Sequence, residues 1–231
     1  AIIWLESATG PVEFARPTDL SVLPDASLRW IFALFIAGLG VKAALVPLHG
    51  WLPAAMAAPA PVSALLHAVA VVKAGAFGIV RVVYDVFGIA SVQELGVGTP
   101  LAVLASITIL WGSLRALQQG EIKKRLAFST VSQVSYIILG AALAGPYATI
   151  GGLAHLVHQG LMKITLFFCA GIYDERAGVK RIEGLNGLGA RMPVTSVCFS
   201  LGALGMIGLP PMAGFVSKIY LGIGALQAEA P

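Results

Sequence analysis

Four of the lysines in this sequence lie inside long apolar runs: Lys42, Lys73, Lys163 and Lys218. A lysine at the centre of a bilayer costs about 2.5–3.5 kcal/mol on insertion scales, so such residues are rare and point to function by default. Because burial disfavours the charged form of an amine, a buried lysine can gain and lose a proton as its surroundings change. The alternative is that the amine snorkels to the membrane surface, which suits Lys42 and Lys218 near helix breaks better than Lys73 and Lys163.

A second set of polar residues shares the apolar stretch of Lys163. His155, Gln159 and Lys163 are spaced i, i+4, i+8, so they lie on one face of a helix, and His158 lies on the flank of that face. Histidine already titrates near neutral pH. The spacing therefore predicts a proton relay made of histidine, lysine and trapped water.

The preceding apolar stretch carries a polar stripe of its own, formed by Ser129, Ser132, Gln133 and Tyr136. One interpretation is that serine and glutamine simply hold helices together through hydrogen bonds. Next to a His/Gln/Lys face we favour the other interpretation, that this stripe supports the relay, because polar faces within lipid must meet one another or water.

His67 and Lys73 occupy a third apolar stretch and are six residues apart, so they point to different sides of a helix. We expect them to link polar groups on two neighbouring helices. A lone buried histidine can also be a purely structural residue, and this alternative stays open for His67.

The composition belongs to a membrane protein. Of the 231 residues, 58% are hydrophobic and 11% are charged, and the mean hydropathy is +0.87; soluble domains have about 25% charged residues. A spanning helix needs about 20 mostly apolar residues. The stretches that meet this length, the last of them broken by prolines, are Leu28–Val46, Pro61–Phe87, Pro100–Leu117, Leu126–Ala144, Thr149–Tyr173 and Met192–Ala225.

Proline and glycine interrupt two of these stretches beside a lysine. Pro47 follows Lys42, and residues 48–56 can form a second half-helix, whereas Pro210 and Pro211 precede Lys218. Irregular backbone at membrane depth is tolerated only inside protein or beside water, and paired broken helices indicate transporter sites in inverted repeats. We therefore expect an all-α, polytopic transmembrane helical bundle with two discontinuous helices.

The loops predict an orientation. Segments 119–125 and 174–191 are rich in Lys and Arg, whereas 1–28 and 85–99 are acidic. One span between successive loops places the basic segments on one side, and the positive-inside rule assigns that side to the cytoplasm of a cell inner membrane.

Other chemistries find little support in the sequence. Cys169 and Cys198 lie in apolar runs and are interpreted as small apolar residues. We expect no metal, no cofactor, no nucleic-acid partner and no catalysis by this chain itself. The first residue is Ala and the chain stops soon after an apolar stretch begins, which favours an internal fragment of a longer protein.

Four motifs resemble the antiporter-like membrane subunits shared by Mrp-type cation/proton antiporters, respiratory complex I and membrane-bound hydrogenases. They are VKAALVPLHGWLPAAMAAPAPVSALLHAVAVVKAG (41–75), EIKKRLAFSTVSQVSYIILG (121–140), HLVHQGLMKITLFFCAG (155–171) and MPVTSVCFSLGALGMIGLPPMAGFVSKIYL (192–221). Residues 54–87 and 214–221 are most similar to the D-like subunits of Mrp antiporters.

The resemblance implies an inverted-repeat fold, with Lys42 and Lys218 beside the two broken helices and Lys163 as the central lysine of a half-channel. His155 corresponds to a bridging histidine, and His67 and Lys73 to positions that vary between subunits. Many family members have His where this chain has Gln159, so His158 or water would complete the relay.

The domain prediction is an extracytoplasmic loop with the end of a preceding helix over 1–27, and a proton-translocating transmembrane domain of about six helices over 28–226. The predicted function is that of a proton-translocating subunit of an Mrp-type monovalent cation/proton antiporter. The alternative is the homologous pumping subunit of a complex I or hydrogenase-type oxidoreductase. Either role implies other membrane subunits as partners within the lipid bilayer. The transported ions would be protons, with sodium as a candidate second ion. The sequence leaves open which ion is coupled to the protons and in which direction transport runs.

Overall fold

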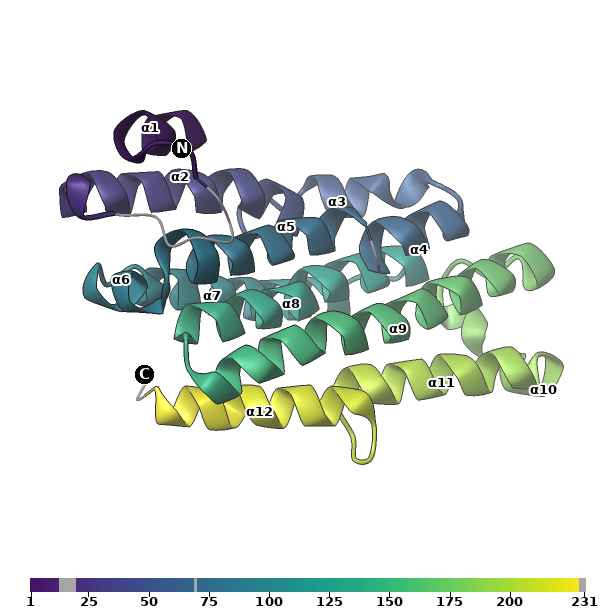
Figure 1. The fold of residues 1–231 in the computed structure, drawn as a ribbon. Helices are drawn as coiled ribbons and strands as arrows, with labels where there is room; N and C mark the ends of the chain where they lie inside the picture. The colour runs from purple at the N-terminus through teal and green to yellow at the C-terminus, as the bar shows by residue number, and fades with distance from the viewer. Residues whose placement is uncertain (13–19, 69, 229–231) are drawn as a thin grey trace.

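The chain folds into a bundle of rod-like helices that run roughly side by side (Figure 1). The computed structural model describes residues 1–12, 20–68 and 70–228. Within that part of the chain there is no β-strand. The α-helices are α1 (Ile2–Thr9), α2 (Asp25–Ala43), α3 (Trp51–Ala54), α4 (Ala60–Ala68), α5 (Val71–Arg81), α6 (Ile89–Glu94), α7 (Gly98–Leu117), α8 (Ile122–Leu143), α9 (Pro146–Ala177), α10 (Leu188–Arg191), α11 (Pro193–Ile207) and α12 (Ala213–Gln227). Short turns of other helix types cover Leu20–Val22, Ala55–Ala57, Val82–Phe87 and Ile182–Leu185.

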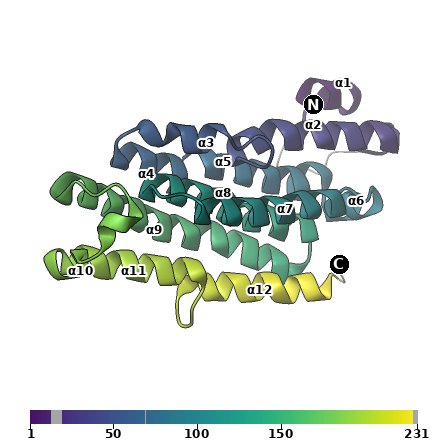
Figure 2. The same cartoon turned by 180° about the vertical axis from the view of Figure 1, so that it is seen from behind.

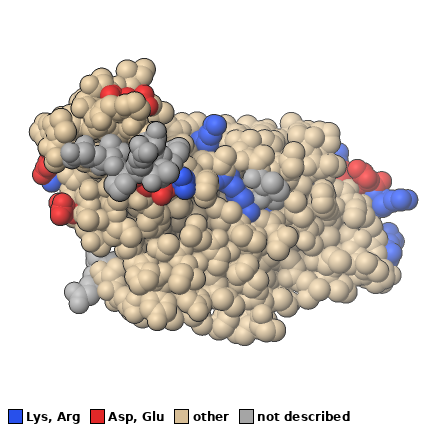
Figure 3. Space-filling view, in the orientation of Figure 1, with Lys and Arg blue, Asp and Glu red and all other residues tan. Residues whose placement is uncertain are grey.

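Five segments of the described chain are long and apolar enough to cross a membrane: Asp25–Ala43, Ala60–Phe87, Gly98–Leu117, Ile122–Leu143 and Pro146–Ala177. Large apolar side chains cover the outside of the bundle; Leu110, for example, is 65% exposed and Val194 is 76% exposed. Figure 3 shows charged side chains gathered toward the two ends of one face, with a broad uncharged belt that a few basic side chains interrupt. Such a belt suits the hydrocarbon of a bilayer, so the prediction of a polytopic helical membrane protein is confirmed.

Helix α8 lies at the centre of the bundle. Of the most apolar 18-residue segment of α8, 72% is buried inside the protein, compared with 33% of the corresponding segment of α7. Figure 2 shows α7 and α8 side by side, with α9 below them. Small residues allow this close approach: a Cβ added to Gly112 of α7 would lie 2.8 Å from the backbone nitrogen of Ser132 on α8. Polar residues on α8 are therefore held inside protein.

Two discontinuities confirm the predicted broken helices. Helix α2 ends at Ala43, Ala44 adopts a left-handed φ of 57°, and the short α3 begins at Trp51. Helix α11 ends at Ile207, Gly208 follows with a φ of 87°, and α12 continues in line with α11 after a loop (Figure 1). The two broken segments run in opposite directions through the bundle, as an inverted arrangement requires.

A third interruption divides the stretch predicted as one helix over 61–87. Helix α4 ends at Ala68, α5 begins at Val71, and the last turn over Val82–Phe87 is a π-helix. Residue 69 lies outside the described residues. His67 lies on α4 and Lys73 on α5, which are separate helices. The relative directions of the two side chains therefore do not follow from a spacing of six residues along one regular helix.

The two basic loops lie against each other at one end of the bundle. The backbone nitrogen of Ile122 donates to the carbonyl of Lys180 (3.0 Å), and that of Ile182 donates to the carbonyl of Gly120 (2.9 Å). The basic segments 119–125 and 174–191 therefore share one end of the molecule, which the charge pattern required. The assignment of residues 1–27 to an extracytoplasmic loop stays a prediction.

Candidate functional site

Lys163 is a fully buried amine near the middle of α9. Its Nζ donates to the carbonyl oxygen of Leu126 (3.0 Å) and to the hydroxyl of Ser129, both on α8. The side chains of Ser129 and Thr130 also donate to the Leu126 carbonyl. In the described part of the chain the partners of this amine are neutral oxygens, so no carboxylate holds it in the charged form.

His155 lies two turns earlier on α9 and joins three helices. Its Nδ1 is 2.9 Å from the hydroxyl of Ser217 on α12, and its Nε2 is 3.1 Å from the amide oxygen of Gln133 on α8. An amide oxygen can only accept, so this network assigns a hydrogen to Nε2. The Ser217 hydroxyl also lies 3.2 Å from the Gly214 carbonyl. It can therefore donate to Gly214 or to Nδ1, and Nδ1 can carry or lack a proton.

Lys218 occupies the gap between α11 and α12. Its Nζ donates to the carbonyls of Met206 (2.7 Å) and Ile207 (3.1 Å), the carbonyls at the end of α11 that lack helical partners. The amine also lies 5.5 Å from the centre of the Tyr136 ring, whose own centre is 5.6 Å from that of His155. The broken helix, α8 and α9 thus meet at one polar cluster.

Lys73 approaches the same cluster from α5. It is 9% exposed, and its Nζ donates to the carbonyl of Leu156 on α9. Lys73, Lys218 and His158 all lie within electrostatic range of His155. Two lysines from different helices therefore surround one histidine.

His67 lies on α4 against the ring of Phe167 on α9, with ring centres 4.8 Å apart, and within electrostatic reach of Lys163. The expectation that His67 and Lys73 link two neighbouring helices is wrong, because both reach α9, at different heights.

Several buried polar atoms around Lys163 have no partner among the described residues: both ring nitrogens of His67, both amide atoms of Gln159 and Nδ1 of His158. A buried polar atom without a hydrogen bond costs about 1–3 kcal/mol, and such atoms are usually satisfied by ordered water. The arrangement favours hydration between His67, Gln159 and Lys163.

Two predicted residues lie elsewhere. Lys42 is on an exposed part of α2, although its own backbone and Cβ lie against Gly75 of α5. The Ser132 hydroxyl is 2.9 Å from that of Ser113 on α7, so it faces away from α9. The other predicted residues come together on α4, α5, α8, α9 and α12: His67, Lys73, Ser129, Gln133, Tyr136, His155, His158, Gln159, Lys163 and Lys218.

Ser217 and His49 were not among the site residues predicted from the sequence. Ser217 is fully buried beside His155, and its place next to Lys218 was the signal that could have found it. His49 lies in the break after α2 and accepts a hydrogen bond at Nε2 from the indole of Trp111 (3.2 Å). A polar ring within a helix break was the signal there.

A polytopic bundle with opposed broken helices and a cluster of buried lysines defines an antiporter-like membrane subunit. The chain belongs to the family described as NADH:quinone oxidoreductase/Mrp antiporter, transmembrane, whose profile matches residues 1–231.

Similar proteins come from both branches of this family. The chain is 41% identical to NADH-quinone oxidoreductase subunit N of Desulforudis audaxviator, covering 98% of this chain and 46% of that protein. It is 40% identical to the A-type subunit of the Na⁺/H⁺ antiporter of Alkalihalophilus pseudofirmus, covering 84% of this chain and 25% of that one. A chain of the Mrp complex from Dietzia sp. DQ12-45-1b superposes with a TM-score of 0.87 at 35% identity, covering 99% of this chain and 42% of that chain. The chain thus spans less than half the length of these relatives.

Proposed function

We propose that this chain is the proton-conducting part of an antiporter-like subunit, in which protons pass between buried lysines and histidines. The observation that carries the proposal is the burial of Lys73 and Lys163 inside the bundle, with His155 on the same helix as Lys163 and bonded to both α8 and α12. Amines placed in such an interior are kept there at a cost of folding energy, which a purely structural role does not explain.

The polar groups supply steps for a proton. Nδ1 of His155 can donate its proton to the Ser217 hydroxyl while that hydroxyl passes its own proton to a bound water, and the Gln133 oxygen keeps the other ring nitrogen protonated and the ring in place. Between His155 and Lys163, the Gln159 amide cannot titrate, so we propose that water bound to its unpartnered atoms bridges that interval. When the Lys163 amine moves away from the Leu126 carbonyl, it can release its proton to the next water of the relay.

For the complex to which the chain contributes, we propose an Mrp-type monovalent cation/proton antiporter in the cell inner membrane, with the basic loops in the cytoplasm. The similarity to the Dietzia Mrp complex and to the A-type antiporter subunit supports this role. The second candidate is a pumping subunit of a quinone oxidoreductase, supported by the 41% identity to subunit N. Other membrane subunits are partners in either case.

Transport by the reconstituted complex tests the proposal. Replacement of Lys163 by Met keeps the side-chain volume and removes the amine, so we expect the initial rate of proton movement into proteoliposomes to fall about tenfold or more. The matched control is Lys124→Met, which removes a lysine in the first turn of α8 whose side chain is 44% exposed and paired with Glu121, and it should leave the rate unchanged.

Equal rates for Lys163→Met and the unmodified complex would refute proton conduction through this cluster. The same proteoliposomes distinguish the two candidate functions. Proton movement driven by a sodium gradient supports the antiporter. Proton movement that requires an electron donor together with quinone as the acceptor supports the oxidoreductase.

A further inference from the structure

The last two carbonyl groups of α11 have no backbone partner because of the sequence that follows them. In an α-helix each carbonyl accepts a hydrogen bond from the N–H group four residues later. For Met206 and Ile207 those residues are Pro210 and Pro211, which have no N–H. The C-terminal end of a helix also carries a partial charge of about −0.5. The break between α11 and α12 therefore presents two free oxygens at the negative end of a helix dipole.

The ammonium group of Lys218 takes the place of a cation between these two oxygens. Its Nζ is 2.7 Å from the Met206 carbonyl and 3.1 Å from the Ile207 carbonyl, and it lies 5.5 Å from the centre of the Tyr136 ring, whose face attracts cations. The titratable groups that face it are Tyr136 on α8 and His155 on α9, whereas α11 contributes backbone oxygens. Among the described residues no carboxylate pairs with Lys218.

Two more oxygens border the space that the Lys218 side chain fills. A Cβ added to Gly208 would lie 3.1 Å from Cδ of Lys218 and 3.4 Å from the carbonyl oxygen of Gly214. The hydroxyl of Ser217 lies 3.2 Å from that same carbonyl. Unwound carbonyls at the C-terminal ends of half-helices coordinate sodium in transporters with broken helices. The oxygens around Lys218 are thus of the type that binds an alkali cation.

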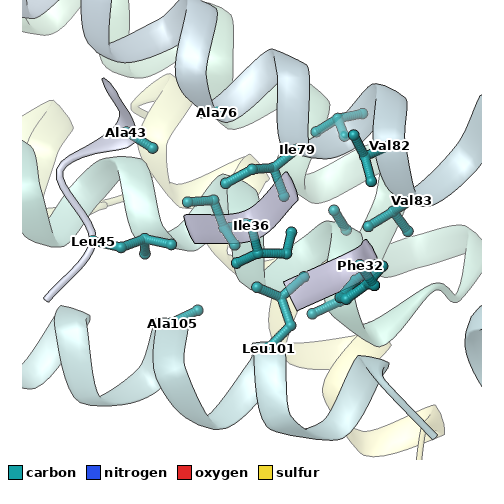
Figure 4. Packing of buried hydrophobic residues seen from close by; sticks show 14 of the residues in the cluster. Phe32, Ile36, Ala43, Leu45, Ala76, Ile79, Val82, Val83, Leu101 and Ala105 are labelled. Carbon is teal, nitrogen blue, oxygen red and sulfur yellow. The ribbon is translucent and has the colours of Figure 1, made fainter. Parts of the chain in front are cut away.

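The break after α2 is built differently. Figure 4 shows Ala43 and Leu45 beside that break, packed with apolar residues of α5 and α7. The carbonyl of Val41 accepts a hydrogen bond from the indole of Trp51 (2.7 Å), a neutral donor, and Lys42 is exposed. Within the described residues, an amine bound to the carbonyls of a helix end is therefore a property of the second break.

We propose that the gap between α11 and α12 binds a monovalent metal cation, which competes with the ammonium group of Lys218 for the carbonyls of Met206 and Ile207. This inference rests on the proposed proton pathway. When Lys218 releases its proton to the relay at His155, the neutral amine leaves the two carbonyls and the cation takes its place. One positive charge replaces another, so the exchange needs no carboxylate. The site holds a proton or a metal cation and never both, which couples the two ions one to one.

Equilibrium binding of ²²Na⁺ to the intact, purified complex in detergent, measured over a range of pH, tests the site. Because only the deprotonated amine frees the carbonyls, we expect the apparent Kd of the unmodified complex to fall about tenfold per pH unit while Lys218 is protonated. Lys218→Met removes the amine, so its sodium binding should be strong and independent of pH. Lys218→Arg keeps a cation that does not deprotonate, so this site should bind no sodium at any pH.

Lys124→Met is the matched control and should keep the pH dependence of the unmodified complex. A general loss of folding cannot produce the opposite effects expected of the two Lys218 variants. Identical sodium binding in both of them, or weaker binding by Lys218→Met than by the unmodified complex in acid, would overturn the proposal. Transport by Lys163→Met remains the separate test of proton conduction. If that variant stopped proton movement while the Lys218 variants bound sodium alike, the proton pathway would stand and the cation site would be wrong.

Discussion

At the residue scale, Ser129 and Ser132 are close together on α8 and contact different helices. Ser129 accepts a hydrogen bond from Lys163, whereas Ser132 bonds to Ser113 of α7. We predict that Ser129→Ala lowers proton transport several-fold, because Lys163 loses a partner. Ser132→Ala should leave transport intact and lower the free energy of unfolding by about 0.5–1.5 kcal/mol. Transport in proteoliposomes and unfolding in detergent measure the two effects, and a reversed pattern would contradict the assignment of the two serines.

Substitution of Gln159 should affect the stability of the protein and proton transport differently. Both of its amide atoms are buried and have no partner in the described part of the chain, so Gln159→Met removes polar atoms at nearly constant volume. We predict that the free energy of unfolding stays the same or rises by about 1–2 kcal/mol, while proton transport falls, because the bridging water loses its binding site.

The contrasting variant is Gln159→His, which supplies a titratable ring at the same place and should retain transport. If Gln159→Met transported protons at the normal rate, the amide would have no part in the pathway.

At the element scale, glycines bring α12 onto α9 and thereby place Ser217 beside His155. A Cβ added to Gly151 would lie 2.7 Å from the backbone nitrogen of Leu221 and 2.9 Å from the carbonyl of Ser217. We predict that Gly151→Ala pushes the helices apart, lowers the free energy of unfolding by about 1–3 kcal/mol and slows transport.

Gly38 on α2 provides the control for this packing prediction, since an added Cβ there would meet nothing within 4 Å. Gly38→Ala should leave both the melting midpoint and transport unchanged or slightly improved. Equal effects of the two substitutions would show that close packing at Gly151 does not position the cluster.

At the scale of the whole molecule, the described chain has two chemically different ends. Loops rich in Lys and Arg pair with each other at one end, and the segment 88–97, which contains α6 and its acidic residue Glu94, lies at the other (Figure 1). The positive-inside rule then predicts that the basic end faces the cytoplasm.

Cysteine labelling in cells tests this orientation. Gln93 is exposed near the acidic end, and the side chain of Lys180 is 72% exposed at the basic end. In a background with Cys169 and Cys198 replaced by Ala, we predict that a membrane-impermeant maleimide labels Gln93→Cys in intact cells. Lys180→Cys should react only after permeabilisation. The opposite pattern would invert the topology.

The sequence alone determined the membrane class, the apolar spans, the two breaks and the common face of His155, Gln159 and Lys163. These properties are local: hydropathy is summed along a segment, and the helical period relates residues only a few turns apart. The motifs in 41–75 and 192–221 likewise sufficed to identify the family.

Only the tertiary structure decided which partners those faces meet. It turned Ser132 toward α7, left Lys42 on an exposed surface, brought His67 and Lys73 to the same helix, and placed Ser217 on His155. Each outcome depends on the rotation and height of one helix against another. Those are set by glycine contacts and helix interruptions between distant segments, which a periodicity within one segment does not contain.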